Sequence, residues 1–522
     1  MADDLERSII PRAESQLAVS GGNRIVAGMV EDAVLLGRQE AIAQSASFRI
    51  GDYHWCEPDY RQILLWAEAL RMEPLAVIEK LVAGKETKDV ATRFQDGRLL
   101  SLSWNLDELP LSDFRCLEKL TVEKLLIYRP TYFEVIGAMK LHLWDSIVAG
   151  RKKAAIQEIS VNLSTLRAFW CGDVGIKALI LSGVPNLATL DCASDQRTAL
   201  NLSPIHHASN RLRRLDLSHV PKLTTLNCSG NPLRKLDLSC VPKLTTLSCD
   251  VHGLRKLNLS YVPDLTEFCC RLYGFGELEL DLSSVPNLTK LRCELCGSRK
   301  LDLSSVPNLT ELSCYESFGE LGLDLSHVPN LTKLSYELCG PRKLDLSSVP
   351  NLTDLTCFQN QLSELDLSHV PKLTDLYCFG NLLTELDLSH VPNLTGLTCD
   401  ANQLTKLNLS FVPKLTKLSY LSNKIIDLDL SRVPNLTQLN CSKNQLTQLD
   451  LSQVPNLTTL DCSDNQLSEL SLSHVPLLTK LNCFDNPMAE LDIRPLLSLK
   501  NLMYDYVKRR RRLIQRPDQH FF

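Results

Sequence analysis

Leucines and small polar residues alternate along most of this chain, in a pattern that returns at short and regular intervals. The stretch "LTDLTCFQNQLSELDLSHVPK" (residues 352–372) is followed directly by "LTDLYCFGNLLTELDLSHVPN". The period of two in "LTDLTC", and again in "LSELDLS", predicts two short strands in each unit. Asparagine and small polar residues between them favour a turn, and proline follows the second segment, where it removes no ladder hydrogen bond.

The dipeptide Val-Pro measures the period of this pattern. From Pro329 to Pro476 every interval between successive copies is 21 residues, and earlier intervals are 21, 22 or 23, with one gap of 36 between Pro185 and Pro221. A fixed period of this length is typical of a solenoid, in which each unit makes one turn and only the stack of turns encloses a core. About 14 turns at the usual strand spacing predict a coil roughly 65–70 Å long.

The unit L-x-x-L-x-C-x-x-N-x-L-x-x-L-D-L-S-x-V-P-x resembles the leucine-rich repeat, and its length and second half look like the short bacterial class called IRREKO-type repeats. The resemblance covers about Leu166 to Asp492. It implies an α+β chain overall, in which a right-handed, β-rich solenoid of roughly 14 turns of about 21 residues follows a small α-helical N-terminal region. By analogy alone it also implies a binding role.

The ends of the chain read differently from the repeats. The stretch "EPDYRQILLWAEALRMEPLAVIEKLVAG" predicts two helices, with Pro58 in the first turn of one, Pro74 at the start of the other and Gly84 at its end, and "DAVLLGRQEAIAQ" predicts an earlier helix. This helical part is either a cap or a separate interaction module. We expect four segments: a helical region (1–90), degenerate repeats or an N-terminal cap (91–165), the solenoid (166–495), and a C-terminal cap with a basic tail (496–522).

Repetition aligns the sequence with itself, so each position of the unit becomes a column. Thirteen of the nineteen cysteines share one column, in which Tyr336 and Tyr420 replace cysteine in two units. A metal site or a disulfide ladder would not tolerate tyrosine there, so we interpret the column as small buried apolar side chains.

Two polar columns run beside the leucines. An asparagine column from Asn231 to Asn486 is expected to bond the backbone of the turns. Five consecutive units carry other residues there, which marks either a binding irregularity or a decayed stretch. An aspartate column from Asp216 to Asp492 predicts a solvated or backbone-bonded stripe, and calcium-dependent rigidity is the alternative.

The resemblance also indicates where a partner binds, because leucine-rich repeats typically present the variable residues of the first strand on a concave sheet. Phe358 and Phe379 lie one unit apart and are expected to stack, beside Tyr377 on the same face. An exposed aromatic cluster on a polar sheet is a usual contact site, and the alternative is that both phenylalanines shield leucines at the strand edge. The candidate partner-binding residues are Tyr315, Asp354, Phe358, Asp375, Tyr377 and Phe379.

Composition narrows the class of function. For 522 residues a net charge of −5 is small, which indicates neither nucleic acid nor an acidic membrane surface as a general partner. The acidic start "MADDLERSIIPRAESQ" and the lack of a long apolar run predict a cytoplasmic protein without a signal peptide or membrane span, and export as an effector is an alternative. No common catalytic motif occurs, so we expect no enzyme activity, metal or cofactor.

We therefore predict a non-catalytic scaffold that binds another protein on its concave sheet and takes no small-molecule substrate. In the alternative, a sensor or effector, the repeats select the target and the helical N-terminal region carries the activity. Nucleic acid is expected only at the basic run, which is otherwise a solvated tail and consists of Lys508, Arg509, Arg510, Arg511 and Arg512.

Overall fold

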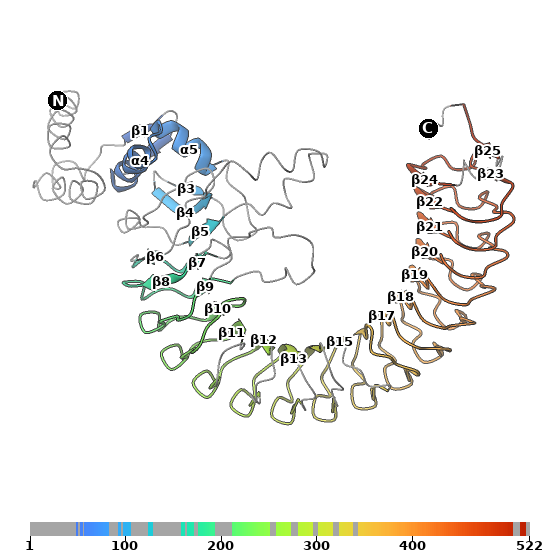
Figure 1. Cartoon of the computed structure of the whole chain (residues 1–522), viewed down its shortest axis with the longest axis horizontal. Helices are drawn as coiled ribbons and strands as arrows, with labels where there is room; N and C mark the ends of the chain where they lie inside the picture. The colour runs from blue at the N-terminus through green and yellow to red at the C-terminus, as the bar shows by residue number, and fades with distance from the viewer. Residues whose placement is uncertain are drawn as a thin grey trace, which may run out of the picture. The chain divides into compact units, whose positions relative to one another are not determined.

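The protein is described from a computed structural model, and Figure 1 shows its course. The chain divides into two compact units, Met1–Val262 and Pro263–Phe522. Both contain turns of a β-solenoid, about 14 in all, which confirms the expected fold class. The structure describes residues 48–50, 53–55, 57–82, 92–95, 98–105, 124–128, 158–161, 164–171, 176–193, 211–250, 257–272, 280–295, 301–316, 323–337, 343–504 and 512–517.

The first unit begins with the two helices that the sequence predicts. Helix α4 spans Glu57–Leu70 and α5 spans Pro74–Val82, next to the hairpin of β1 (Phe48–Ile50) and β2 (Tyr53–Trp55). Trp66 of α4 and Ile78 of α5 are fully buried, and α5 contacts strand β4 (Arg98–Asn105). The earlier predicted helix, "DAVLLGRQEAIAQ", lies outside the described residues.

A parallel ladder forms the rest of the first unit. Strand β3 (Arg93–Gln95) pairs antiparallel with β4, and from β4 onward each strand of the ladder is parallel to the next. This ladder already includes β4 and β5, within the segment read as degenerate repeats. Its later strands are β5 (Lys124–Tyr128), β7 (Ala168–Trp170), β9 (Thr189–Asp191), β10 (Thr225–Asn227) and β11 (Thr246–Asp250).

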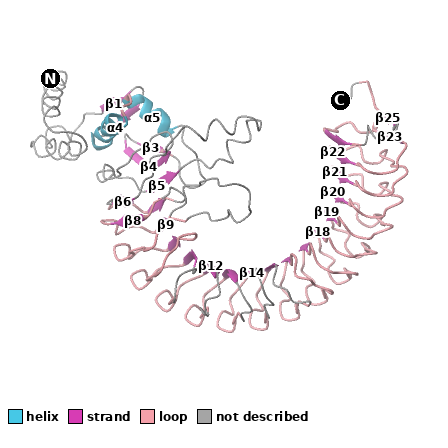
Figure 2. Cartoon of the chain, viewed as in Figure 1, coloured by secondary structure: helices cyan, strands magenta, loops and turns pink. Residues whose placement is uncertain are grey.

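The second unit is a longer parallel ladder with one strand in each turn. Its strands line the inner, concave side of the curve within this unit, and the loops follow the outer side (Figure 2). The strands are β12 (Glu267–Leu272), β13 (Lys290–Leu295), β14 (Glu311–Glu316), β15 (Lys333–Glu337), β16 (Asp354–Thr356), β17 (Asp375–Tyr377), β18 (Gly396–Thr398), β19 (Lys417–Ser419), β20 (Gln438–Asn440), β21 (Thr459–Asp461), β22 (Lys480–Asn482) and β24 (Asn501–Met503).

The prediction of a second strand in each unit is wrong for most turns. In the described residues, second-half segments pair as strands only in β6 (Glu158–Val161) with β8 (Ala178–Leu181), and in β23 (Glu490–Asp492) with β25 (Arg512–Ile514), which begins at the last residue of the basic run. In a typical described turn the second half forms no strand, and Asp366 Oδ1 accepts a hydrogen bond from Ser368 N (2.9 Å). Because these segments lie on the outer side of the curve, successive turns are farther apart there than along the strands.

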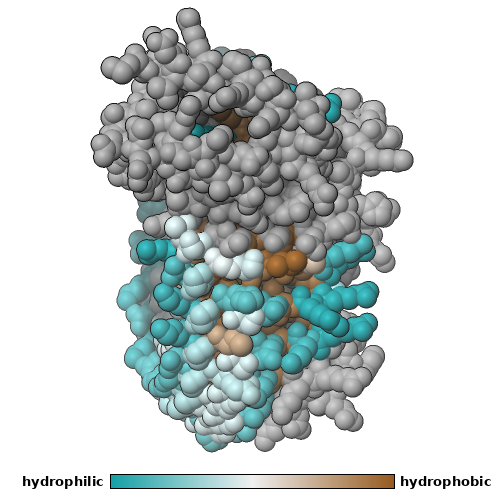
Figure 3. Space-filling view, turned by 90° about the vertical axis from the view of Figure 1, so that its left-hand side faces the viewer, coloured by the Kyte–Doolittle hydropathy of each residue, from teal (hydrophilic) through white to brown (hydrophobic). Residues whose placement is uncertain are grey.

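Within each unit, leucines of the described turns point into a shared core. Leu355 of β16 and Leu376 of β17 are fully buried, and they are register partners in the ladder. Val370, just before the repeat proline, is also fully buried. Outside this core the described surface in Figure 3 is mostly hydrophilic, with apolar residues exposed in a narrow band between polar side chains.

Candidate functional site

The strands β16 and β17 present alternate residues to the concave side. Leu355 and Cys357 point into the core, whereas Asp354, Thr356 and Phe358 between and beside them are only half-buried. The alternation follows from the pleat of a strand, in which successive side chains point to opposite faces. The sequence prediction that this column faces outward is therefore confirmed.

A tight turn after β17 fixes the residue that follows the buried cysteine. In the turn of β17, Gly380 has a positive φ of 70°, and a Cβ there would lie 2.8 Å from Gln359 Cγ. The Asn381 Nδ2 donates to the backbone oxygens of Cys357 (2.7 Å) and Cys378 (3.1 Å). These bonds hold Phe379 in place, and they confirm that the asparagine column bonds the turn backbone.

The two phenylalanines stack, as the sequence predicts. The ring centroids of Phe358 and Phe379 are 5.0 Å apart and the ring planes differ by 11°. Both side chains are half-buried, while Tyr377 beside them is 46% exposed. An offset stack of this kind contributes about 0.5–1.5 kcal/mol beyond the burial of its surface.

Two aspartates lie on the same face of these strands as the rings. Asp354 and Asp375 are register partners of adjacent strands, and each accepts a bond from the hydroxyl of the threonine before it, at 2.6 Å and 3.0 Å. Two carboxylates about 5 Å apart in water repel by roughly 0.8 kcal/mol. Within the described part of the chain, no cationic side chain lies within 4.0 Å of either carboxylate, although Lys333 is the register partner of Asp354.

Tyr315 does not join this group. It lies in β14, two strands before β16, and its register partner in β15 is Glu337. The guanidinium carbon of Arg292 sits 5.0 Å from the centroid of its ring, which is the geometry of a cation–π contact. The structure thus brings together five of the six candidates, which we call the β16–β17 patch: Asp354, Phe358, Asp375, Tyr377 and Phe379.

Leu382, in the turn after β17, is an exposed apolar residue that sequence reasoning missed. It is 46% exposed and follows Asn381 in the turn after Phe379. Other units carry glutamine or lysine in this column, at Gln361, Gln403 and Lys424. One turn therefore exposes apolar atoms at three positions, 377, 379 and 382. The leucine in place of glutamine or lysine was the sequence signal for this.

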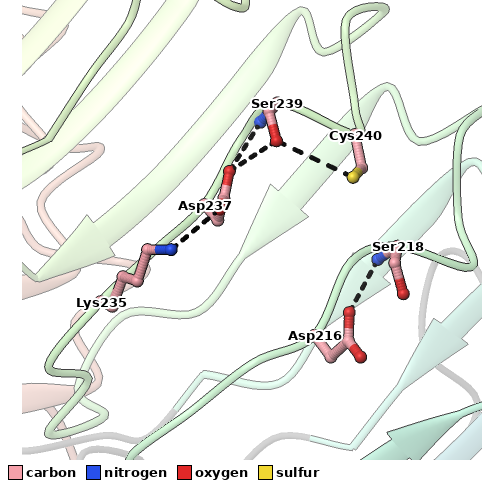
Figure 4. Close-up of polar contacts among 6 residues, drawn as sticks. All are labelled: Asp216, Ser218, Lys235, Asp237, Ser239 and Cys240. Carbon is pink, nitrogen blue, oxygen red and sulfur yellow. Dashed lines mark hydrogen bonds and ion pairs between the residues drawn. The ribbon is translucent and has the colours of Figure 1, made fainter.

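The aspartate column forms hydrogen bonds within its own chain on the outer side of the coil. In Figure 4, Asp216 accepts from Ser218 N (2.9 Å), and Asp237 accepts from Ser239 N (3.1 Å), Ser239 Oγ (2.7 Å) and Lys235 Nζ (3.0 Å). The Ser239 hydroxyl and Lys235 lower the pKa of Asp237 to about 2. The stripe is thus backbone-bonded, as predicted. Among the described residues no group of three or more His, Cys, Asp or Glu side chains is placed to hold a metal ion.

The described members of the cysteine column are buried and form no disulfide bonds. Cys357, Cys378 and Cys399 are fully buried, and so are Tyr336 and Tyr420 in the same column. Burial raises the pKa of the Cys378 thiol to about 12, which disfavours the thiolate that a metal site or disulfide exchange requires. The interpretation as small apolar residues is confirmed.

Three other expectations have different outcomes. No described helix has the length and apolar character needed to cross a membrane. Lys508, Arg509, Arg510 and Arg511 of the basic run lie outside the described residues, while Arg512 begins β25. The five units that interrupt the asparagine column also fall outside the described residues at that position, so the choice between a binding irregularity and decay stays open.

Comparison with known proteins identifies the type of repeat. A family model described as leucine-rich repeats (2 copies) matches residues 434–474. The functional domain of InlJ from Listeria monocytogenes, which includes a cysteine ladder, is 31% identical over 62% of this chain and 68% of that chain, with a TM-score of 0.49. A leucine-rich repeat protein of Leptospira interrogans is 18% identical over 62% and 86%, with a TM-score of 0.46.

YopM from Yersinia enterocolitica is also similar, at 24% identity over 77% of this chain and 83% of that chain, with a TM-score of 0.42. No curated protein matches this sequence. All three TM-scores are below 0.5, so none of these similarities shows what this chain binds.

Proposed function

Because this chain is a leucine-rich repeat protein, we propose that it is a non-catalytic scaffold that binds a partner protein on the concave sheet of its second unit. The observation that carries the proposal is the β16–β17 patch. There an exposed tyrosine and a phenylalanine stack lie beside two aspartates that have no described cation within 4.0 Å.

An exposed aromatic group of this kind supports binding for a physical reason. Burial of an aromatic side chain against a partner releases apolar surface from water, and aromatic residues dominate the energies of protein interfaces. Phe484 occupies the same column as Phe379, and is 39% exposed, but its neighbours in that column, Ser442 and Ser463, are polar. The combination of Phe358, Tyr377 and Phe379 is therefore local to β16 and β17.

Affinity capture with variants tests the proposal. The full chain, Tyr377→Ser, Phe358→Ser/Phe379→Ser and the control Phe484→Ser are used as baits, and the captured proteins are quantified by mass spectrometry. We expect at least one protein whose recovery falls ten-fold or more with both patch variants and stays unchanged with Phe484→Ser. Tyr377→Ser removes an exposed side chain and leaves the Phe358–Phe379 stack intact. The circular dichroism and melting temperature of this variant are therefore expected to match those of the parent chain.

If every captured protein is recovered equally by the parent chain and both patch variants, the patch is not the binding site. If recovery is equal and Tyr377→Ser also folds normally, the proposal that a partner binds the concave face loses its support.

We infer further that residues 57–82 cap the first unit. Val77, Ile78 and Leu81 of α5 are buried, and this helix contacts β4. A solenoid needs such a cover because its terminal turn otherwise exposes leucines. The alternative of a sensor or effector, with activity in the helical N-terminal region, stays a prediction, as does the cytoplasmic location.

A further inference from the structure

We propose that the partner presents one or two arginine or lysine side chains, flanked by apolar residues, to the β16–β17 patch. This inference rests on the proposed function, because it specifies the chemistry of the segment that the same surface binds. Four features of the second unit support it: the order of charges along the sheet, a glycine beside Asp375, an intramolecular cation–π contact and the apolar border.

Charges alternate along the first outward column of the earlier strands. Glu267, Lys290, Glu311 and Lys333 are the first residues of β12 to β15. Lys290 Nζ lies 3.3 Å from Glu267 and 3.8 Å from Glu311, so one cation compensates two carboxylates on neighbouring strands. Opposite charges on adjacent strands stabilise a sheet, and like charges directly opposite destabilise it.

The alternation ends at β16 and β17. After Lys333 the column continues with Asp354, Asp375 and Gly396, and these three are successive register partners. The position where the next cation of the series would stand is occupied by Asp375, and the residue after it in the column is a glycine. A Cβ at Gly396 would lie 2.7 Å from Asp375 Oδ1, so the Asp375 carboxylate extends over the glycine. A cation from a partner would restore the alternation at this point.

A cation placed here would also contact an aromatic ring. The described part of the second unit already contains a contact of this kind, where the Arg292 guanidinium carbon lies 5.0 Å from the centroid of the Tyr315 ring. Arg292 and Tyr377 occupy the same outward column, and the ring of Tyr377 is 46% exposed. A guanidinium between Tyr377 and the aspartates would combine an ion pair with a cation–π contact.

The lysines on either side of the two aspartates limit how many basic residues the partner's segment can have. Lys333 precedes Asp354, and Lys417 follows Gly396 in the column. These lysines would repel a long run of basic residues, so the acidic stretch suits one or two cations only. Phe379 and the exposed Leu382 in the turn of β17 favour apolar residues next to them in the partner.

Selection from a random peptide library tests the inference. A library of twelve-residue peptides displayed on phage is panned against the immobilised full-length chain, and the same selection is made with Asp354→Asn/Asp375→Asn. The matched control is Asp366→Asn/Asp387→Asn, which changes two aspartates of the same turns on the outer side. Asparagine already occurs in that column at Asn408, where it keeps the bond from Ser410 N (3.1 Å).

We expect the parent and control chains to enrich peptides with arginine or lysine beside aromatic or aliphatic residues. The best peptide is then synthesised with a fluorescent label, and a second version carries citrulline, which is neutral, in place of arginine. In fluorescence anisotropy we expect Kd to rise at least ten-fold for the citrulline peptide and for Asp354→Asn/Asp375→Asn, and less than three-fold for the control.

Each other result overturns one of the two ideas. If the peptides depend on Tyr377 but show no excess of basic residues, or bind Asp354→Asn/Asp375→Asn as tightly as the parent, the partner chemistry is wrong while the binding face stands. If the peptides bind Tyr377→Ser and Phe358→Ser/Phe379→Ser as tightly as the parent, the proposed function fails. If no peptide is selected, a short basic segment is not what this surface binds.

Discussion

Replacement of Asn444 by alanine is expected to destabilise the solenoid far more than loss of one ordinary hydrogen bond. The Asn444 Nδ2 donates to the backbone oxygens of Tyr420 (3.0 Å), Cys441 (3.2 Å) and Ser442 (3.1 Å). Its Oδ1 accepts from the backbone N–H of Ile425 (3.1 Å), which is buried. The side chain thus connects its own turn of the coil with the preceding one.

The four bonds contribute unequally to stability, because each of the three carbonyl oxygens also accepts a hydrogen bond from another donor. The oxygens of Tyr420 and Cys441 also accept from the amide nitrogens of Asn423 and Asn465, and the Ser442 oxygen accepts from Ser422 N. Alanine therefore leaves one buried N–H unpaired, at about 1–3 kcal/mol, and weakens three acceptors, at about 1–2 kcal/mol together. We expect a loss of about 2–5 kcal/mol in the free energy of unfolding.

Asn435 provides the matched control, since it is an asparagine of the neighbouring loop. Its side chain is exposed and donates one bond of 3.4 Å to the Pro413 oxygen. Asn435→Ala is expected to change the free energy of unfolding by about 0.5 kcal/mol or less. Both variants are compared with the parent by urea unfolding followed by far-UV circular dichroism. Equal stabilities of the two variants, within about 1 kcal/mol, would refute the idea that the asparagine column holds the turns together.

Two further predictions concern pH. Ser239 and Lys235 hold the pKa of Asp237 at about 2, below its ordinary 3.8, so this carboxylate contributes stability above about pH 4 that is lost as the pH falls toward 2. Asp237→Asn should therefore make the Tm less dependent on pH between 5 and 2.5, and an unchanged dependence of Tm on pH would count against this reasoning. Burial raises the pKa of Asp400, because its ionised form is poorly solvated there. Its Oδ1 accepts hydrogen bonds from Ser419 Oγ (2.6 Å) and Leu421 N (2.8 Å). Asparagine at this position (Asp400→Asn) keeps an accepting oxygen and removes the buried charge. The Tm of this variant should exceed that of the parent at pH 7.5 and equal it at pH 3, and a lower Tm at pH 7.5 would contradict this reasoning.

Much of the candidate site was predictable because the repeat places equivalent residues in register. Once each unit makes one turn, Phe358 must lie beside Phe379, and Cys357 beside Cys378. The period of two then decides that the phenylalanines face outward and the cysteines inward. The exposed Leu382 was also predictable from the sequence, since it replaces a glutamine or lysine that other units carry at this position.

The sequence by itself therefore determined the solenoid, the buried leucine and cysteine columns, the asparagine ladder and the stacking of the two phenylalanines. The reason is that a repeated unit repeats its local geometry. Only the tertiary structure decided that second halves stay unpaired in most described turns, because curvature separates the outer segments while the inner ones remain at ladder spacing. It also decided that Lys290 reaches two carboxylates whereas no described cation reaches Asp375, since such contacts depend on side-chain conformations that a column of letters does not contain.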